Sequence, residues 1–316
     1  MSKLRAGVIG VGYLGRFHAQ KYAALKGVEL VGVVDYDPAR ADEIAAEVKA
    51  KAFTDHKELL SQVDLVSIVV PTQYHFGVAK DCLDAGVHIL LEKPVTQTVE
   101  EAEELIALAK EKGLVFQVGH LERFNPAILA LEDVLDNPLF IETHRLAPFK
   151  ARGTDVNVVL DLMIHDIDII LSLVGSKIKT VNAVGVPVLT EQGDIANARL
   201  QFENGCVANV TASRVSRDSM RKIRIFQQDA YVSIDYEARK TAIYRKGGKG
   251  LPVPSIPNVT MEHASFKKSD ALLAEIESFI EAVTEGKAPV VSGEDGKRAL
   301  EVALQITQKL WHEVRP

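Results

Sequence analysis

Residues 4–15, LRAGVIGVGYLG, carry the strongest structural signal in the chain. An apolar run that predicts a strand is joined to the start of a helix through Gly10, Gly12 and Gly15, in the spacing G-x-G-x-x-G. The first glycine permits a tight turn, the second leaves room for a pyrophosphate, and the third lets helix and strand approach closely. Because glycine-bearing turns are common, this spacing predicts a dinucleotide site only if the surrounding chain supports it.

A second apolar run, VELVGVVD at residues 28–35, ends in an acidic residue. This residue is Asp35, about 20 positions beyond Gly15, which is the spacing of the carboxylate that binds a ribose 2′-hydroxyl in dinucleotide-binding folds. A carboxylate there would repel the 2′-phosphate of NADP, so the favoured cofactor is NAD. Arg40 keeps NADP open, since an arginine nearby can accommodate that phosphate, although a solvated position on a surface helix is its more ordinary role.

Short apolar runs alternate with helix-like segments from residue 4 to about residue 118. The runs lack a polar face, as expected of parallel strands covered by helices on both sides. We therefore predict an α/β protein whose N-terminal domain, residues 1–120, is a Rossmann doubly wound parallel sheet. The remainder, residues 121–316, is expected to be a substrate-binding and oligomerisation domain of the α+β type, with an open, mainly antiparallel sheet.

The second domain is predicted from a change of pattern after residue 120. Asn204-Gly205, between two strand-like arms, favours a type I′ hairpin. The segment KGGKGLPVPSIPNVT, rich in proline and glycine, predicts an exposed loop. Expected elements are a helix at about 123–135, a strand near 139–147, a strongly apolar helix at about 157–174, further strands, and helices at about 269–285 and 294–313.

The composition is typical of a globular protein that binds small molecules. With 316 residues, 47% of them hydrophobic, the chain is long enough for two domains. A formal net charge of −6 lacks the basic excess expected of proteins that bind nucleic acid or anionic membranes. Cys82 and Cys206 suggest neither disulfides nor a cysteine zinc site, and they fit a reducing cytoplasm. The most apolar long segment, residues 156–174, contains three aspartates and a histidine, so we expect no membrane span.

Polar residues stand where two of the apolar runs end. Ligands of open α/β sheets bind beyond the carboxyl ends of the strands. One run leaves into PTQYH, residues 71–75, and the run VHILL leaves into Glu92, Lys93 and Pro94. Substrate, cofactor and water can solvate a lysine at this place, whereas the plainer alternative is a surface ion pair worth about 0.2–1 kcal/mol. The predicted cofactor site comprises Gly10, Gly12, Tyr13, Leu14, Gly15, Asp35, Pro71, Thr72, His75, Glu92 and Lys93.

A narrow polar stripe follows the apolar segment NVVLDLMIHDIDIILSLV. Asp161 and His165 are four residues apart and share a helical face, which Asp168 and Ser172 extend. Solvated faces usually carry Lys, Glu or Arg, so this stripe indicates an active-site wall, although a hydrogen-bonded core histidine is as common an explanation. We expect no metal site, because Asp166 turns away from His165 by about 100° on a helix and no HExxH pattern occurs.

The motifs GVIGVGYLGRFHAQ, VVDYDPARA, VVPTQYH, LLEKPV and DLMIH occur in this order. Together they resemble the glucose-fructose oxidoreductase / inositol dehydrogenase / MocA (Gfo/Idh/MocA) family along nearly the whole chain. The resemblance implies an N-terminal Rossmann domain and a C-terminal α/β domain that often builds homodimers or homotetramers. It also implies NAD(P)-dependent oxidation or reduction at a sugar or cyclitol carbon.

Residue roles follow from the same resemblance. Lys93 corresponds to the lysine of the family's E-K-P motif, and Asp161 and His165 to its D-x-x-x-H pair. His165 would then be the general base for a substrate hydroxyl, Lys93 would polarise that oxygen, and Asp161 would orient the imidazole or bond a neighbouring hydroxyl. The family's Lys-Pro bond is commonly cis, which would make Pro94 the residue that directs Lys93. The family often has Asn where this chain has Gln73, so the contact there is open.

The segments VGHLERFNPAI and LDLMIHDIDIILSLVG narrow the resemblance. They are similar to the branch that oxidises the 3-hydroxyl of UDP-N-acetylglucosamine before a transamination in the biosynthesis of a lipid A variant, which would make an aminotransferase a downstream partner. The segment SRVSRDSMRKIR also concentrates arginines, which bind phosphate in bidentate fashion, although ordinary solvated arginines explain any one of them equally well. Candidate substrate-binding residues are Lys93, Arg123, Arg152, Asp161, His165 and Arg214, with Arg145 as a further candidate.

Three other functions stay open on the sequence. A dehydrogenase of a free sugar or inositol would leave the arginine cluster without a role in substrate binding. A glycosidase that uses NAD transiently would show no net redox change. A dinucleotide-sensing protein without catalysis would have no need for Lys93, Asp161 and His165 together.

Overall fold

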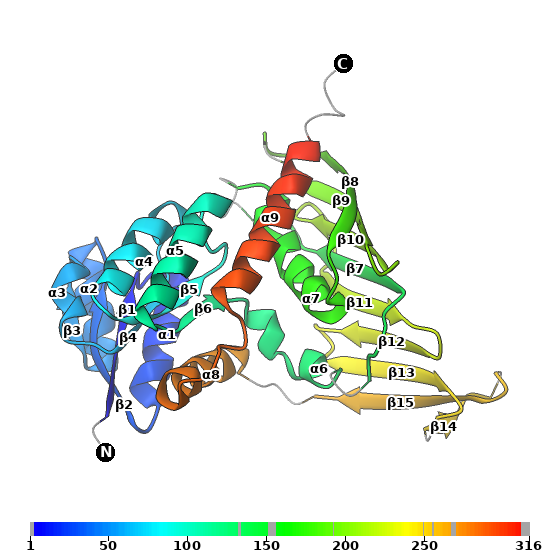
Figure 1. Ribbon diagram of the computed structural model, residues 1–316, viewed down its shortest axis with the longest axis horizontal. Coiled ribbons are helices and arrows are strands. Elements are labelled where there is room, and N and C mark those ends of the chain that lie inside the picture. The colour runs from blue at the N-terminus through cyan, green and yellow to red at the C-terminus, as the bar shows by residue number, and fades with distance from the viewer. Residues whose placement is uncertain are drawn as a thin grey trace. The chain divides into compact units, whose positions relative to one another are not determined.

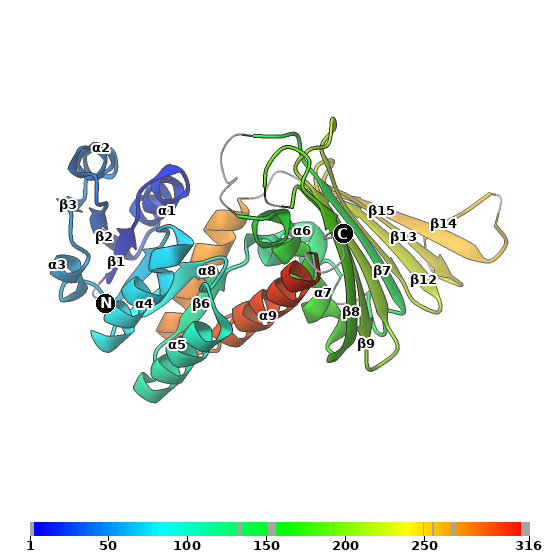
Figure 2. The same cartoon turned by 90° about the horizontal axis from the view of Figure 1, so that it is seen from above.

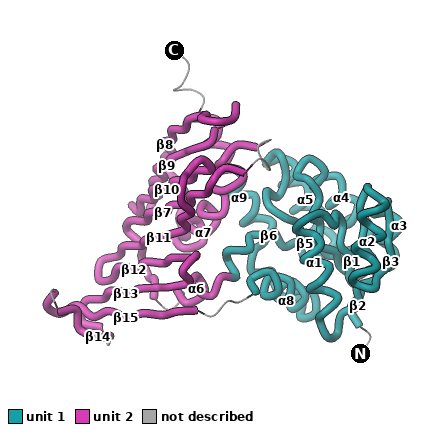
Figure 3. Tube along the Cα trace, turned by 180° about the vertical axis from the view of Figure 1, so that it is seen from behind, with its two compact units in different colours: residues 1–124, 270–300 teal, residues 125–269, 301–316 magenta. Residues whose placement is uncertain are grey.

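The computed structural model describes residues 3–131, 134–150, 156–191, 193–248, 250–254, 256–266 and 270–310. The chain forms two compact units (Figure 3). Unit 1 contains residues 1–124 and 270–300, and unit 2 contains residues 125–269 and 301–316. The predicted boundary lay at residue 120 and assigned the whole C-terminal part to the second domain. Residues 270–300 instead pack with the N-terminal unit.

Unit 1 is built around a six-stranded sheet of the predicted doubly wound kind (Figure 1). The strand order is β3-β2-β1-β4-β5-β6, and every pair of neighbours is parallel. The strand order reverses between β1 and β4, which is where ligands bind in such sheets. The strands are β1 Leu4–Ile9, β2 Val28–Val34, β3 Lys51–Phe53, β4 Leu65–Ile68, β5 His88–Glu92 and β6 Phe116–Gly119.

Helices cover this sheet, and their ends follow local sequence signals. Thr98 and Glu101 form a reciprocal capping box at the start of α5, and Gly113 ends that helix in the left-handed conformation. α8 belongs to the same core, to which it contributes Ile276 and Phe279. The helices are α1 Tyr13–Ala24, α2 Pro38–Val48, α3 Lys57–Leu60, η1 Thr72–Tyr74, α4 His75–Asp84, α5 Val99–Lys112, η2 Leu121–Phe124, α8 Ala271–Glu285 and the start of α9 Gly293–Leu310.

Unit 2 contains a nine-stranded sheet in the order β14-β15-β13-β12-β11-β7-β10-β9-β8. Figure 2 shows this sheet from above. Neighbouring strands are antiparallel except β7 and β10, so the prediction of a mainly antiparallel sheet is confirmed. The strands are β7 Phe140–Leu146, β8 Ile178–Val186, β9 Ile195–Phe202, β10 Val207–Ser213, β11 Met220–Phe226, β12 Ala230–Asp235, β13 Lys240–Lys246, β14 Leu251–Pro252 and β15 Val259–Ser265.

The helices of unit 2 differ in part from the predicted ones. The apolar helix expected at 157–174 is present as a π-helical turn, η3 Val159–Met163, that continues into α7 Ile164–Val174. The prediction of a single helix at about 123–135 is wrong. The chain forms η2 and then the four-residue helix α6, Pro126–Leu129. Asn125 and Pro126 explain the break, because the Asn125 side chain caps a new helix that begins at the proline.

Two connections between strands also differ from the predicted ones. Gly205 has a positive φ of 91°, but Asn204 does not have a positive φ, so the turn is not of type I′. The connection is a three-residue loop, residues 203–205, in which the Asn204 side chain accepts the N–H of Cys206. Part of the predicted exposed loop at 246–260 forms β14, which pairs with β15. None of the helices in the described part of the chain has the length and apolarity needed to span a bilayer.

Candidate active site

Unit 1 has a cavity of about 1080 Å³ at the carboxyl ends of its parallel strands. The strand ends β1, β2, β4 and β5 all contribute to its wall, as expected for a switch-point site. Seven of the predicted cofactor-binding residues line it, namely Gly10, Gly12, Leu14, Asp35, Pro71, Glu92 and Lys93. The cavity lining does not include Tyr13, Gly15, Thr72 or His75.

Glycine is required at each of the three positions of the loop for a different physical reason. Gly10 has a φ of 86°, and an added Cβ would lie 2.8 Å from the backbone of Val69. At Gly15 the added Cβ would lie 1.8 Å from the carbonyl oxygen of Gly10, so only glycine lets the helix approach the loop. Gly12 is different, because its Cβ would point into space, with Arg40 Nη1 3.7 Å away. Close approach of a ligand therefore remains as the physical reason for glycine at this position.

The cavity fits a dinucleotide at this loop. Gly12 is the N-cap of α1 and, like other glycines, supplies no side-chain cap, so the N–H groups of the first turn lack an intrahelical partner. Such an N-terminus attracts a pyrophosphate. Asp35 lies at the end of β2 in the same cavity, where its Oδ2 accepts the N–H of Val11 at 3.0 Å and its Oδ1 accepts the N–H of Asp37 at 3.1 Å. The carboxylate is thereby fixed beside the glycine loop.

Lys93 lines the cavity directly after β5. The carboxylate of Glu92 accepts the backbone N–H of Lys93 at 3.2 Å, and the peptide bond from Lys93 to Pro94 is cis, as the resemblance implied. The lysine that follows the apolar run VHILL therefore lines a cavity, whereas the Glu92 carboxylate is mostly buried. A cation held there can stabilise negative charge that develops on a substrate oxygen.

His75 holds two of the strand exits together instead of lining the cavity. Its Nδ1 lies 2.8 Å from the carbonyl oxygen of Pro94, and its Nε2 lies 2.9 Å from the carbonyl oxygen of Val70. The ring is buried. Burial lowers the pKa of His75, and the two carbonyls oppose that shift. His75 therefore ties the segment after β4 to the turn that carries Lys93.

Several cavity residues were missed by the sequence analysis. Thr54 and His56 follow β3, Tyr36 follows Asp35, and Tyr74 belongs to η1. The signal that would have found Thr54 and His56 is the rule already used for β4 and β5, because β3 ends at the same edge of the sheet. The strand is three residues long, too short for its apolar pattern to be noticed.

In unit 2, Asp161 lies on the π-helical turn and His165 on the first turn of α7. Both side chains are partly exposed, unlike the buried Asp166 and Asp168. Asp166 accepts two hydrogen bonds from Arg145, at 2.9 and 3.0 Å, and this buried ion pair fixes α7 against β7. The predicted polar stripe therefore has three partly exposed members, Asp161, His165 and Ser172, and one buried member, Asp168.

The candidate arginines lie in different environments. Arg214 is buried and donates to Asp194, to the carbonyl oxygen of Val156 and to the Thr190 hydroxyl, all within unit 2. Arg123 lies in unit 1 with its guanidinium 3.8 Å from Asp295. Arg152 lies outside the described residues. Arg123 and Arg214 therefore belong to different units.

The parallel sheet, the glycine loop and Lys93 at the cavity wall define a class, the NAD-binding oxidoreductases with a Rossmann unit. Residues 4–120 match the model of the oxidoreductase family with an NAD-binding Rossmann fold, and residues 141–233 match the GFO/IDH/MocA C-terminal domain. The chain belongs to the GFO/IDH/MocA oxidoreductase family.

Individual relatives agree with this assignment. The chain is 47% identical to the UDP-N-acetylglucosamine 3-dehydrogenase of Acidithiobacillus ferrooxidans, over 97% of each chain, and a solved structure of that enzyme covers 98% of each chain with a TM-score of 0.93. The NAD(+)-dependent scyllo-inositol 2-dehydrogenase of Bacillus subtilis is 28% identical, over 96% of this chain and 93% of that protein. A scyllo-inositol dehydrogenase of Lactobacillus casei with NAD(H) and scyllo-inositol shares the fold at 21% identity, covering 99% of this chain and 98% of that one, with a TM-score of 0.81.

Proposed function

We propose that the chain oxidises the 3-hydroxyl of UDP-N-acetylglucosamine to a 3-keto sugar with NAD as the oxidant. The observation that carries the proposal is the 47% identity, over 97% of each chain, to an enzyme of that name. The identity to the inositol dehydrogenase of Bacillus subtilis is much lower, at 28%. Lys93, Asp161 and His165 stand at the positions that the resemblance assigned to catalysis.

NAD is proposed over NADP because of Asp35. When bound, the nicotinamide accepts a hydride from the substrate carbon. Gly10, Gly12 and Leu14 would hold the pyrophosphate end, and Asp35, fixed by two backbone N–H groups, would accept from the ribose hydroxyls and repel a 2′-phosphate. Arg40 supports the alternative, because its guanidinium also lines the cavity.

We assign the proton chemistry to three side chains. His165 takes the proton from the substrate hydroxyl, since an imidazole titrates near neutral pH. Lys93 stabilises the negative charge that develops on that oxygen. Asp161 orients the imidazole or bonds a neighbouring hydroxyl. Arg123 and Arg152 are proposed to contact the diphosphate, and Arg214, through its bonds to Asp194 and Thr190, to shape the surrounding chain.

Reduced-nicotinamide absorbance tests the proposal. Purified protein, NAD and a panel of UDP-sugars, free sugars and inositols are mixed, with an aminotransferase present to remove the keto product. Absorbance that requires UDP-N-acetylglucosamine supports the proposal. Turnover of inositol instead, release of sugar without absorbance, or cofactor binding without any turnover would contradict it in favour of the inositol dehydrogenase, the glycosidase or the sensor, respectively.

Two variants test the assigned roles. Lys93→Ala and His165→Ala are each expected to lower kcat by at least about a hundredfold, the scale of acid-base and electrostatic catalysis, while NAD binding persists. Lys110→Ala, at an exposed position of α5 outside the cavity lining, is the matched control and should leave kcat and NAD binding unchanged. Near-normal kcat in both active-site variants would remove the role assignment.

We also propose a downstream partner, an oligomeric state and a cellular location for the enzyme. A 3-keto sugar is a substrate for transamination, so a downstream aminotransferase is the proposed partner in making a lipid A precursor. We propose a homodimer or homotetramer from the habit of the family. A cytoplasmic location agrees with two buried cysteines that form no disulfide.

A further inference from the structure

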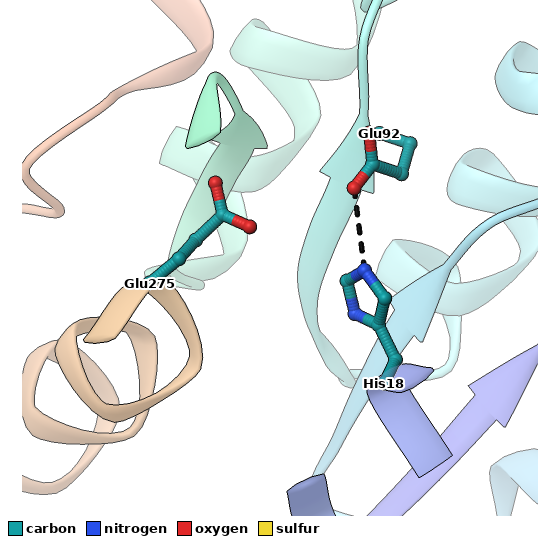
Figure 4. A group of neighbouring side chains, drawn as sticks. All are labelled: His18, Glu92 and Glu275. Carbon is teal, nitrogen blue, oxygen red and sulfur yellow. Dashed lines mark hydrogen bonds and ion pairs between the residues drawn. The ribbon is translucent and has the colours of Figure 1, made fainter. Parts of the chain in front are cut away.

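Three titratable side chains meet in the interior of unit 1, and two of them have no role assigned above (Figure 4). They are His18 from α1, Glu92 from β5 and Glu275 from α8, and one polar atom of each lies within 4.8 Å of those of the other two. His18 and Glu275 have an exposed fraction of 0%, and Glu92 is 9% exposed. The carboxyl group of Glu275 points toward the other two side chains.

Hydrogen-bond accounting shows that the cluster lacks a donor. His18 Nε2 lies 3.3 Å from Glu92 Oε1, and since an ionised carboxylate accepts, Nε2 carries the hydrogen. Glu92 Oε2 accepts the N–H of Lys93. Among the described residues, no donor reaches the lone pair on His18 Nδ1 or either carboxyl oxygen of Glu275. One additional proton would supply the missing donor.

The charges of the buried side chains also indicate that the cluster holds one additional proton. With both glutamates ionised, two negative charges would be buried close together, and buried carboxylates in this situation neutralise by binding a proton. Burial raises the pKa of Glu275 well above its ordinary value of 4.5, and the charge of Glu92 raises it further. Because Glu92 remains in contact with an N–H donor on each side, Glu275 is the site where the proton is held more favourably.

The other groups packed against Glu275 do not replace this proton. Tyr22 on α1 shares a hydrogen bond with the hydroxyl of Ser67, at 3.0 Å. Gln117 on β6 donates to the backbone carbonyl oxygen of Glu275, not to its side chain. η2 also packs against α8 and carries Glu122 and Arg123, and the Arg123 guanidinium lies near Asp295.

We propose that Glu275 is a neutral carboxylic acid whose proton is donated to His18 Nδ1 through one water, so that His18 Nε2–H is aimed at Glu92. A water that makes two hydrogen bonds of about 2.8 Å spans about 4.6 Å between its partners, and one polar atom of each of the three side chains lies within 4.8 Å of those of the other two. Glu275 is then a positioning residue, because it acts through His18 and Glu92 on the strand end that carries Lys93. The inference holds whatever substrate the enzyme oxidises.

A divalent cation is the competing occupant, since an imidazole and two carboxylates are ligands that Zn²⁺ accepts. The geometry favours the proton. A cation would compete for Glu92 Oε1, which already accepts from His18, and its ligands would have to lie about 2.0–2.2 Å from the ion. Metal analysis of the purified enzyme distinguishes the two occupants.

Infrared difference spectroscopy is the first test. The spectrum of the wild type minus that of Glu275→Gln is expected to contain, at neutral pH, the carbonyl band of one protonated carboxylic acid. Glu277→Gln is the matched control, because Glu277 is an exposed glutamate on the same helix, and it should give no such band. Absence of the band in the Glu275→Gln difference spectrum overturns the proposal.

The pH dependence of the melting temperature is the second test. A folded-state pKa above 4.5 means that the wild type loses stability as pH rises from 4.5 toward that folded pKa. Glu275→Gln lacks this loss, so its melting temperature relative to wild type is expected to rise as the pH is raised above 5. Glu275→Leu, which leaves His18 Nδ1 without a donor, should melt lower by at least about 3 °C. A pH-independent difference for Glu275→Gln contradicts the proposal.

Two measurements on the wild type do not depend on a variant that folds. In protein labelled with ¹³C at the glutamate carboxyl carbons, one resonance should stay at the protonated chemical shift at neutral pH, and its absence would contradict the proposal. One equivalent of copurifying metal, or stoichiometric uptake of added Zn²⁺ by the wild type, would assign the cluster to a cation instead.

Discussion

At the scale of single residues, Gly12 and Gly15 belong to one motif, but a side chain is excluded at the two positions for different reasons. An added Cβ at Gly15 would lie 1.8 Å from a carbonyl oxygen, whereas at Gly12 it would meet only the flexible end of Arg40 at 3.7 Å. Gly15→Ala is therefore expected to lower the free energy of unfolding by about 3 kcal/mol or more. Gly12→Ala should change it by about 1 kcal/mol or less, the scale of a helix-cap effect.

The two variants should also differ in their affinity for NAD. Gly12→Ala places a methyl group where the pyrophosphate approaches, so we expect NAD affinity to fall at least about tenfold in a protein of near-normal stability. Urea unfolding and isothermal titration calorimetry measure the two quantities. Equal destabilisation by both substitutions, or unchanged NAD affinity in Gly12→Ala, would contradict the separate roles.

Asp35 combines a structural bond with cofactor choice. Its two oxygens accept the N–H groups of Val11 and Asp37, so the side chain holds the glycine loop as well as facing the cavity. Asp35→Ser removes the negative charge. We expect the ratio of kcat/KM for NAD to kcat/KM for NADP to fall about 10- to 100-fold, the cost of losing a charged hydrogen-bond acceptor. An unchanged ratio would assign cofactor choice elsewhere.

At the scale of elements, the connection between β8 and β9 depends on one buried carboxylate. Asp194 accepts the N–H groups of Val188, Leu189 and Thr190 and pairs with Arg214. Burial alone would raise the pKa of Asp194, but the N–H groups of Leu189 and Thr190, the Thr190 hydroxyl and the Arg214 guanidinium hold it well below its usual range. The carboxylate is therefore a fixed anion that orders a loop and a strand end together.

Asp194→Asn is expected to lower the free energy of unfolding by about 3–5 kcal/mol, since it removes the charge that compensates a buried guanidinium. Because the folded pKa is depressed, the wild-type contribution is fully present above the ordinary pKa of 3.8 and is lost as pH falls through the folded value. Urea unfolding between pH 7 and pH 2 should show the two proteins converging in acid. A constant difference across that range would refute the assignment.

Elements with a strong apolar pattern were predictable, and those set by specific side-chain bonds were not. The strands of unit 1 are continuous apolar runs, so their parallel arrangement followed from burial on both faces. The hairpin at residues 203–205 and the break at Asn125 depend on which backbone N–H an asparagine side chain accepts, and composition does not reveal that choice. The π-helical turn at Asp161 likewise had no signal in the periodicity of the sequence.

The candidate site was predictable to the same extent. Strand ends and the glycine spacing located most of the cavity wall in unit 1, because the fold class dictates where ligands bind. The partners of buried charges were not predictable. Arg214 and Arg145 looked like phosphate ligands in the sequence, but each makes a buried ion pair with an aspartate distant in sequence. Such pairing is known only once the elements are placed.

At the scale of the whole molecule, the two units can be tested as separate cores. Phe279 is fully buried in unit 1 although it lies near the C-terminus, and Ile225 is fully buried in unit 2. Phe279→Ala is expected to cost about 3–5 kcal/mol and Ile225→Ala about 2–5 kcal/mol. Hydrogen exchange should lose protection in β1 and β2 for the first variant and in β11 and β12 for the second. Uniform loss of protection in both variants would contradict the division.

The late position of α8 has a consequence for biosynthesis. The 145 residues from 125 to 269 separate the two parts of unit 1 along the chain. A ribosome that adds about 5–20 residues per second needs about 7–30 s to make that interval. During this delay the emerging N-terminal sheet is without the side chains of Ile276 and Phe279, so its apolar surface is open to chaperones and to other nascent chains.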